Sequence, residues 1–147
     1  MPQAQMVFKT VVPADQEVVF AYVSDLSKHG EWAGNELVIT PNDVGQGLAV
    51  GKSYSSKATV RDLVFDAQLT VSQFEPAGRF AFKGADSTGS FEHTFTFKSV
   101  DGGTEVTRVA DFELSLYLWI RFWVLYLPVR KPAGDRAMEN LRKKFLH

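Results

Sequence analysis

The sequence predicts an α+β fold, in which a curved antiparallel sheet of six or seven strands is covered on one face by a long C-terminal helix. First, much of residues 52–114 alternates apolar and polar side chains with the two-residue period of half-buried strands. Second, short turns such as Pro76-Ala77-Gly78 and Asp101-Gly102-Gly103 separate these strands, which favours antiparallel hairpins. Third, residues 131–145 return to helical spacing.

The N-terminal part of the chain predicts one strand and two short helices. Residues 5–12 are rich in β-branched side chains, and Pro13 ends the strand because it has no N–H for a ladder. Residues 14–23 predict a short helix, with acidic side chains in its first turn and apolar side chains at helical spacing. A second helical turn is expected over residues 25–28, before Gly30.

The remaining strands follow one another and lead into the last helix. A strand over residues 37–40 ends at Pro41, and a loop that contains several glycines follows it. The last helix, over residues 131–145, accommodates Pro132 in its first turn, where a backbone N–H has no helical partner. The other expected strands cover residues 52–60, 63–74, 79–85, 90–99 and 104–114.

The composition is that of one folded domain, expected over residues 1–147. Since the chain has no cysteine, disulfides, thiol catalysis, Cys-ligated zinc and iron–sulfur clusters are excluded. The formal net charge of −1 gives no global attraction to nucleic acid, so no nucleic-acid partner is expected. The first residues lack the pattern of a signal peptide, and the longest apolar stretch is too short to span a membrane, so a cytoplasmic location is expected.

Motifs for catalysis or cofactor binding are missing from the sequence. It has no P-loop, no Gly-x-Ser-x-Gly and no His-Glu-x-x-His pattern. The three histidines, His29, His93 and His147, are widely separated along the chain and do not have metal-ligand spacing. We therefore expect no cofactor and no metal. The catalytic residues are unknown, with His93 and Arg108 as the candidates.

The unusual feature of this composition is its share of aromatic residues. Twelve Phe, four Tyr and three Trp make up 13% of the chain, which predicts either a bulky core or a cavity with aromatic walls. Because a single helix covers a wide, curved sheet incompletely, we favour the cavity.

Strand parity predicts which side chains would line that cavity. In residues 90–99, Phe91, His93 and Phe95 share one face, and Arg108 lies on the apolar face of a neighbouring strand. A buried, neutral His93 could hydrogen-bond a ligand or move a proton, or it could be satisfied by a neighbouring group. Arg108 could bind a carboxylate or enolate, or it could reach solvent or pair with an acid. The predicted ligand-binding residues are Trp32, Tyr54, Ser56, Phe65, Phe91, His93, Phe95, Arg108, Phe112, Trp119, Trp123, Met138 and Leu141.

Residues 114–129 are apolar on all sides, which one buried element seldom requires. Three interpretations are open: a helical plug at one end of the cavity, an exposed gate or association surface, and a peripheral membrane contact. The basic residues that follow, such as Arg130 and Lys131, would suit an anionic surface but are also typical of a solvated helix face. We expect a monomer or a weak homodimer without stable membrane insertion.

Several segments together carry a resemblance to a known superfamily. These are residues 12–20, 23–26 (Val-Ser-Asp-Leu), 31–32 (Glu-Trp), 103–107 (Gly-Thr-Glu-Val-Thr) and 141–146. In this order the chain resembles the START/Bet v 1-like (SRPBCC) superfamily, and in particular its polyketide cyclase/dehydrase-like branch. The resemblance implies a helix-grip fold, with two short helices between the first two strands and a deep cavity between the sheet and the last helix.

This resemblance leaves the function open, since its members include carriers, receptors and enzymes. The first hypothesis is binding of a small hydrophobic, aromatic or lipid-like ligand in the cavity. A polyketide cyclase or aromatase that uses the same cavity is one alternative. A protein-interaction module that uses residues 114–129 is another.

Overall fold

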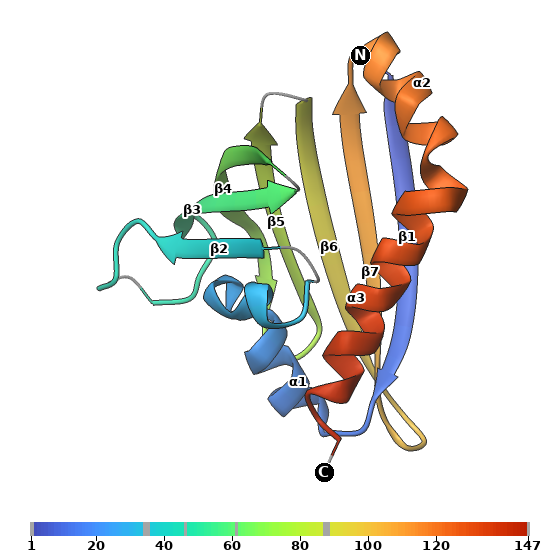
Figure 1. Cartoon of the computed structure of the whole chain (residues 1–147). Coiled ribbons are helices and arrows are strands. Elements are labelled where there is room, and N and C mark those ends of the chain that lie inside the picture. Colours follow the sequence, from blue (N-terminus) through green and yellow to red (C-terminus); the bar gives the residue numbers. More distant parts are fainter. Residues whose placement is uncertain (1, 34–35, 46, 61, 87–88, 147) are drawn as a thin grey trace.

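The computed structural model describes residues 2–33, 36–45, 47–60, 62–86 and 89–146. Within these residues the strands form a seven-stranded antiparallel sheet in the order β1-β7-β6-β5-β4-β3-β2 (Figure 1). This confirms the predicted curved antiparallel sheet. The strands are β1 (Gln3–Val12), β2 (Glu36–Pro41), β3 (Ser53–Val60), β4 (Leu63–Glu75), β5 (Arg79–Asp86), β6 (Gly89–Val100) and β7 (Gly103–Leu114).

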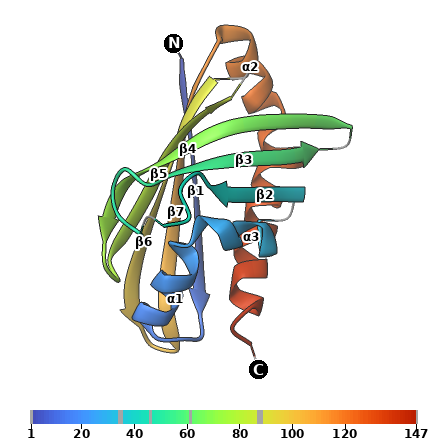
Figure 2. The same ribbon diagram turned by 90° about the vertical axis from the view of Figure 1, so that its left-hand side faces the viewer.

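The helices lie on the inner, concave side of this sheet. Two short helices, α1 (Gln16–Val23) and the 3₁₀ turn η1 (Leu26–Glu31), connect β1 to β2, as predicted. The C-terminal region forms α2 (Leu116–Val124), a π-helical turn η2 (Tyr126–Arg130) and α3 (Lys131–Lys143). Figure 2 shows the curvature of the sheet and the helices on its inner side.

The register of the sheet confirms the predicted side-chain parity. Phe95 on β6 pairs with Arg108 on β7, and His93 pairs with Ala110, so all four side chains point to one face. That face is the inner one, because Phe95 and Ala110 are buried there. A register shift between β4 and β5 at Val71 marks a bulge, which adds to the bend of the sheet.

Helix α1 closes one end of the inner face. The Phe20 ring lies 5.2 Å from Phe97 on β6 and 5.5 Å from Phe74 on β4, both in edge-on geometry. The buried Thr104 hydroxyl donates to the Ala14 carbonyl over 2.8 Å, which attaches the segment before α1 to the start of β7. The inner face is therefore packed at this end.

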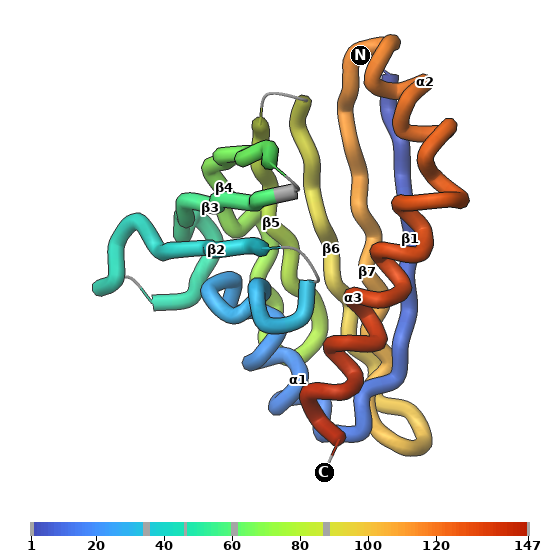
Figure 3. Tube along the Cα trace, in the orientation of Figure 1, coloured from blue at the N-terminus to red at the C-terminus, as the bar shows by residue number. Residues whose placement is uncertain are grey.

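Helix α3 lies along β1, at one edge of the sheet, rather than across its middle (Figure 3). Gly134 allows this close approach, because a Cβ there would overlap the buried ring of Phe8. Met138 and Leu141 fill the space beneath the helix and are buried. The part of the inner face between α3 and the strands β3 and β4 is less completely covered, as the partial exposure of its side chains shows.

Candidate functional site

The polar centre of the inner face consists of Arg108 on β7 and His93 on β6. The Arg108 Nη2 and Nε atoms lie 2.9 and 3.2 Å from the His93 Nδ1 atom. A guanidinium has donors only, so Nδ1 must accept these bonds and the ring proton of a neutral His93 must be on Nε2. Both side chains are half-buried. The pair therefore presents N–H donors to the inner face.

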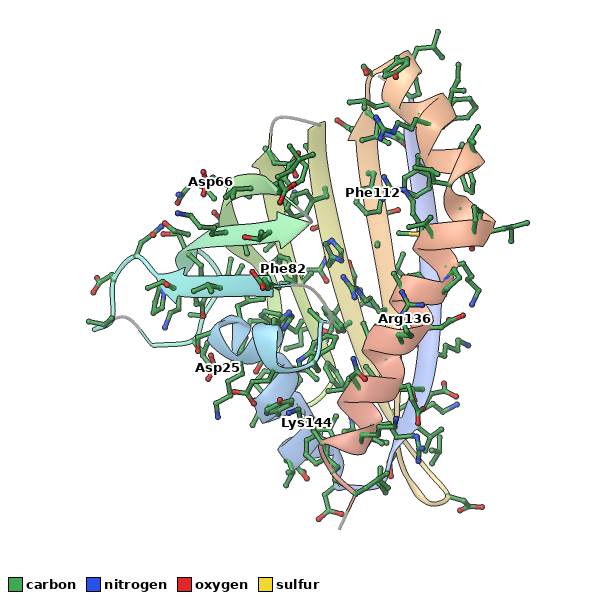
Figure 4. The ribbon with its side chains drawn as sticks, in the orientation of Figure 1. Asp25, Asp66, Phe82, Phe112, Arg136 and Lys144 are labelled. Carbon is green, nitrogen blue, oxygen red and sulfur yellow. The ribbon has the colours of Figure 1, made fainter. Side chains whose placement is uncertain are left out.

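Aromatic rings surround this pair on the sheet. Phe82 stacks on His93 with ring centroids 5.1 Å apart, whereas Phe91 and Phe112 approach the same ring edge-on at 5.5 and 5.9 Å. The Arg108 guanidinium carbon lies 5.7 Å from the centre of the Phe95 ring. In Figure 4, Phe82 and Phe112 mark the two sides of this ring cluster. Gly84 makes room for Phe91, because a Cβ at residue 84 would lie 2.6 Å from the Phe91 ring.

Burial sets the charge states of the pair. Desolvation lowers the pKa of Arg108 to about 10, so the guanidinium stays protonated at neutral pH. Desolvation, the Arg108 charge and nearby His29 lower the pKa of His93 well below 6.5, so His93 is neutral there. The centre therefore carries one positive charge.

No carboxylate balances this charge within the described part of the chain. The ion pairs of α3, Lys131 with Asp135 and Glu139 with Arg142, do not involve Arg108. Arg108 instead hydrogen-bonds a neutral imidazole and faces an aromatic ring. An uncompensated cation on an apolar, half-exposed face is the property that distinguishes this site.

His29 is a central residue that the sequence analysis did not select. It is buried, and its Nε2 atom lies 2.7 Å from the Val23 carbonyl, to which it donates when neutral. Its ring contacts Trp32 at 4.7 Å and Phe95 at 5.8 Å. Desolvation lowers its pKa to about 4. The i,i+3 spacing of His29 and Trp32 in a helical turn was the available signal, since both then face the sheet.

Four buried side-chain atoms have no hydrogen-bond partner among the described residues, those of Ser24 and Arg130 included, and two of the four belong to predicted ligand-binding residues. These two atoms are the Trp32 Nε1 and the Tyr54 hydroxyl, and each residue is only 1% exposed. Desolvation raises the pKa of Tyr54 to about 12, with a smaller contribution from Asp25. Ser56, two residues along β3, is half-buried on the same face. A ligand group that reached the Trp32 or Tyr54 atom would form a hydrogen bond without displacing a partner among the described residues.

The structure brings some of the predicted ligand-binding residues together and separates others. Phe91, His93, Phe95, Arg108 and Phe112 form the cluster described above, and Trp32 joins it through a ring contact with Phe95 at 6.1 Å. Phe65 is half-buried near the start of β4, opposite Ala58.

The other four predicted residues lie outside the cluster. The Trp119 indole donates to the Gln3 carbonyl over 2.9 Å, and Trp123 is 41% exposed. Met138 and Leu141 belong to the core beneath α3. The alternation of side chains along strands could not separate these four residues from the cluster. They lie on helices, and only the tertiary structure defines how those helices pack.

Two surface depressions lie away from the Arg108–His93 pair. One, of about 430 Å³, is lined mainly by polar residues on the outer face of β1, β6 and β7, including Gln5, Glu92 and Asp111. The other, of about 400 Å³, is lined by Glu31, Asn140, Lys143 and Lys144. A closed cavity under the last helix stays a prediction, and the accessible surface of the site is its half-buried inner face.

The described residues contain neither a metal-binding group nor a helix that could span a membrane. Among these residues, no group of three or more His, Asp or Glu side chains is placed to hold a metal ion. In the same part of the chain, every helix is too short or too polar to cross a bilayer.

Several solved structures share this fold. Protein CV1439 from Chromobacterium violaceum has a TM-score of 0.72 at 16% identity, with 97% of each chain covered. Ara h 8.0201 has a TM-score of 0.68 at 10% identity, with 98% of each chain covered. Major latex-like protein 151 from Panax ginseng has a TM-score of 0.68 at 11% identity, with 99% of each chain covered. These TM-scores show a shared Bet v 1-like fold, and at such low identities they show the fold alone.

The sequence itself matches one family over nearly its whole length. A comparison with curated proteins gives no significant match. The family described as polyketide cyclase / dehydrase and lipid transport matches residues 3–147, which include the helices, the sheet and the Arg108–His93 pair. The chain therefore belongs to the polyketide cyclase/dehydrase and lipid transport family, within the START/Bet v 1-like superfamily.

Proposed function

We propose that this protein binds a small, largely apolar ligand on the inner face of the sheet, with a hydrogen-bond-accepting group of the ligand at Arg108 and His93. The observation that carries the proposal is the uncompensated Arg108 charge, hydrogen-bonded to a neutral histidine and surrounded by rings. The family description, which includes lipid transport, supports an apolar ligand.

The apolar part of the ligand would contact the rings that remain partly accessible. Phe65, Phe91 and Phe112 are half-buried on the inner face, in contrast to the fully packed Phe95 and Phe97. Covering such rings stabilises a complex by about 25 cal/mol for each Å² of apolar surface removed from water, before entropy costs. This contribution has little chemical specificity, so the polar pair would orient the ligand.

The polar pair is suited to an acceptor rather than to a donor. Arg108 has only N–H groups, and the accessible imidazole nitrogen of His93 carries the ring proton. A carboxylate or enolate oxygen would accept from these groups and neutralise the charge. The occupied Nδ1 atom and the lowered pKa of His93 support binding over proton abstraction, because both make the imidazole a poor base.

The experiment compares two versions of one probe, a fluorescent long-chain fatty acid and its methyl ester. We expect the wild-type protein to bind the acid about tenfold more tightly than the ester, because a charged hydrogen bond is worth about 1.5–3 kcal/mol. Arg108→Met should remove this preference and leave ester binding nearly unchanged. Arg79→Met, at an exposed position of β5, is the matched control and should retain the preference.

The outcomes separate the two parts of the proposal. If neither probe binds, or if binding leaves the amide and ring NMR signals of Phe91, His93 and Phe112 unchanged, the inner face is not the ligand site. Equal affinity for acid and ester in the wild type would retain the apolar site and overturn the role of Arg108.

A further inference from the structure

Helix α2 and the turn after it expose a continuous apolar face, which we call the α2 surface. Its members recur at helical spacing and are between 41% and 75% exposed. Isolated apolar side chains are common on protein surfaces, but a contiguous group of this kind marks a contact surface. The α2 surface consists of Leu116, Tyr117, Ile120, Trp123, Val124, Leu127 and Val129.

The opposite side of α2 is firmly attached to the sheet. Phe122 is 1% exposed, and its ring lies 5.3 Å from Phe112 on β7. The Trp119 indole donates to the Gln3 carbonyl on β1, and the Ser115 hydroxyl accepts from the Leu118 N–H at the start of the helix. The helix is therefore held with its apolar residues outward, and their exposure does not result from missing contacts on the inner side.

The charges on this segment have one sign. Between residues 114 and 134 the sequence contains Arg121, Arg130 and Lys131 and no acidic residue. Arg121 is exposed. It lies one helical turn after Tyr117, a member of the α2 surface, and so borders that surface. The Arg130 guanidinium lies 4.4 Å from the centre of the Phe122 ring, and Lys131 pairs with Asp135 on α3. Two cations, Arg121 and Arg130, thus have no acidic partner on the segment.

A second copy of the chain is a poor occupant of this surface. In a symmetric dimer the α2 helices would face each other, and each would bring Arg121 and Arg130 without an acid to pair with them. A standard protein interface also involves roughly 20–30 residues on each side, many more than the seven apolar side chains here. An anionic lipid surface has no such requirement and complements the charge.

The geometry points to an anionic phospholipid bilayer as the partner of the α2 surface. The helix would lie in the plane of the interface, with Ile120, Val124 and Leu127 among the acyl chains and Arg121 at the headgroup phosphates. Tyr117 and Trp123 are the residue types that prefer the boundary between headgroups and chains. This inference goes beyond the proposed ligand binding and does not depend on it.

Docking in this way would also place the inner face near the lipid. Phe122 contacts Phe112, which in turn contacts His93, so a continuous series of rings leads from the back of α2 to the Arg108–His93 pair. In Figure 1, the side of α2 that is turned away from the sheet would face the bilayer.

Co-sedimentation with vesicles tests this inference. The probes are vesicles of phosphatidylcholine alone and vesicles of phosphatidylcholine mixed with phosphatidylserine, each at low and at physiological salt. We expect binding to the mixed vesicles, much less binding to phosphatidylcholine alone, and a blue shift of the tryptophan fluorescence on binding, because Trp123 leaves water. Salt should weaken the binding, since charge contributes to it.

Two variants and one control identify the surface that binds. Val124→Glu should lower the partition coefficient at least tenfold, and Arg121→Gln about fivefold, the latter corresponding to one cation at an anionic surface. Val38→Glu changes an equally exposed valine on β2, at 63% against 68%, and should bind like the wild type.

Several results would overturn the inference. These are absence of binding to the mixed vesicles at low salt, equal losses for Val124→Glu and Val38→Glu, and a wild-type dimer in light scattering that Val124→Glu dissociates. If circular dichroism shows that Val124→Glu is unfolded, the vesicle binding of Arg121→Gln alone tests the inference. Arg121 is exposed and is not part of the core, so its replacement should leave the fold intact.

Discussion

Arg108 directs two of its N–H-bearing nitrogens, Nη2 and Nε, at the same acceptor, the Nδ1 atom of His93, at 2.9 and 3.2 Å. Their strands are neighbours, and Arg108 pairs in register with Phe95, two residues beyond His93. This diagonal contact fixes the histidine tautomer and keeps a cation beside a neutral ring.

The first prediction concerns the effect of Arg108 on His93. In Arg108→Met the pKa of His93 should rise, because one of the charges that lowers it is gone, but it should stay below 6.5, since desolvation is the larger cause. An NMR titration of the imidazole nitrogens measures this pKa directly. In Arg136→Met, which changes an exposed residue of α3, the titration should match the wild type. The same pKa in Arg108→Met and wild type would contradict the contact.

The second prediction concerns the stability of the protein in acid. The pKa of His29 is about 4 in the folded protein and about 6.5 when unfolded, so below pH 6.5 the unfolded state binds the proton first. His29 should therefore cost no stability above pH 6.5 and about 3 kcal/mol by pH 4.

Urea unfolding of wild type and His29→Gln at pH 7 and pH 4.5 measures this effect. The wild type should lose more stability than the variant between the two pH values, because glutamine can donate to the Val23 carbonyl but does not titrate. Equal losses in the two proteins would assign the acid sensitivity to other groups.

The third prediction separates ligand binding from stability at Tyr54. Its buried hydroxyl has no hydrogen-bond partner among the described residues, so Tyr54→Phe should leave the free energy of unfolding unchanged or raise it by up to about 1 kcal/mol. If the hydroxyl contacts the ligand, the same variant should weaken binding of the fatty-acid probe.

Tyr22→Phe provides the comparison for Tyr54→Phe. The Tyr22 hydroxyl donates to Glu31 over 2.9 Å, so its removal should cost about 0.5–1.5 kcal/mol of stability without an effect on the probe. A large loss of stability in Tyr54→Phe would show that its hydroxyl already has a partner.

The fourth prediction concerns the docking of α3 on β1. Gly134→Ala should destabilise the protein by about 1–3 kcal/mol, although alanine favours helices, because the new Cβ would overlap the buried Phe8 ring. Thermal unfolding measures the change. Gly47→Ala is the control, since no described atom lies within 4 Å of a Cβ there, and it should be neutral or slightly stabilising. A stabilised Gly134→Ala protein would mean that α3 is not held as close to β1.

Much of the fold could be predicted because strands leave a strong local pattern. The alternation in residues 90–99 corresponds to β6, and the turns at Pro76 and Asp101 lie between paired strands, as expected. The structure of residues 114–129 was harder to predict, because a segment that is apolar on all sides has no periodic signal. Residues 116–124 of this segment form a helix in which Phe122 is buried against the sheet and Val124 is exposed. The contact between Phe122 and Phe112 on β7 determines which side of the helix is buried.

The candidate site was predicted only in part. Parity placed His93 and Arg108 on one face, because alternation is a property of a single strand. Their hydrogen bond depends on the register between two strands, and the central position of His29 depends on how η1 packs against the sheet.

The sequence by itself determined the period of each element, the order of the elements and the faces on which the rings lie, because these follow from local alternation and turn chemistry. Tertiary structure alone decided that Arg108 lacks a counter-ion among the described residues, that α3 lies over β1, and that the outer side of α2 is exposed. The physical reason is that charge balance and exposure depend on which distant residues pack together, and no local pattern in the chain encodes that.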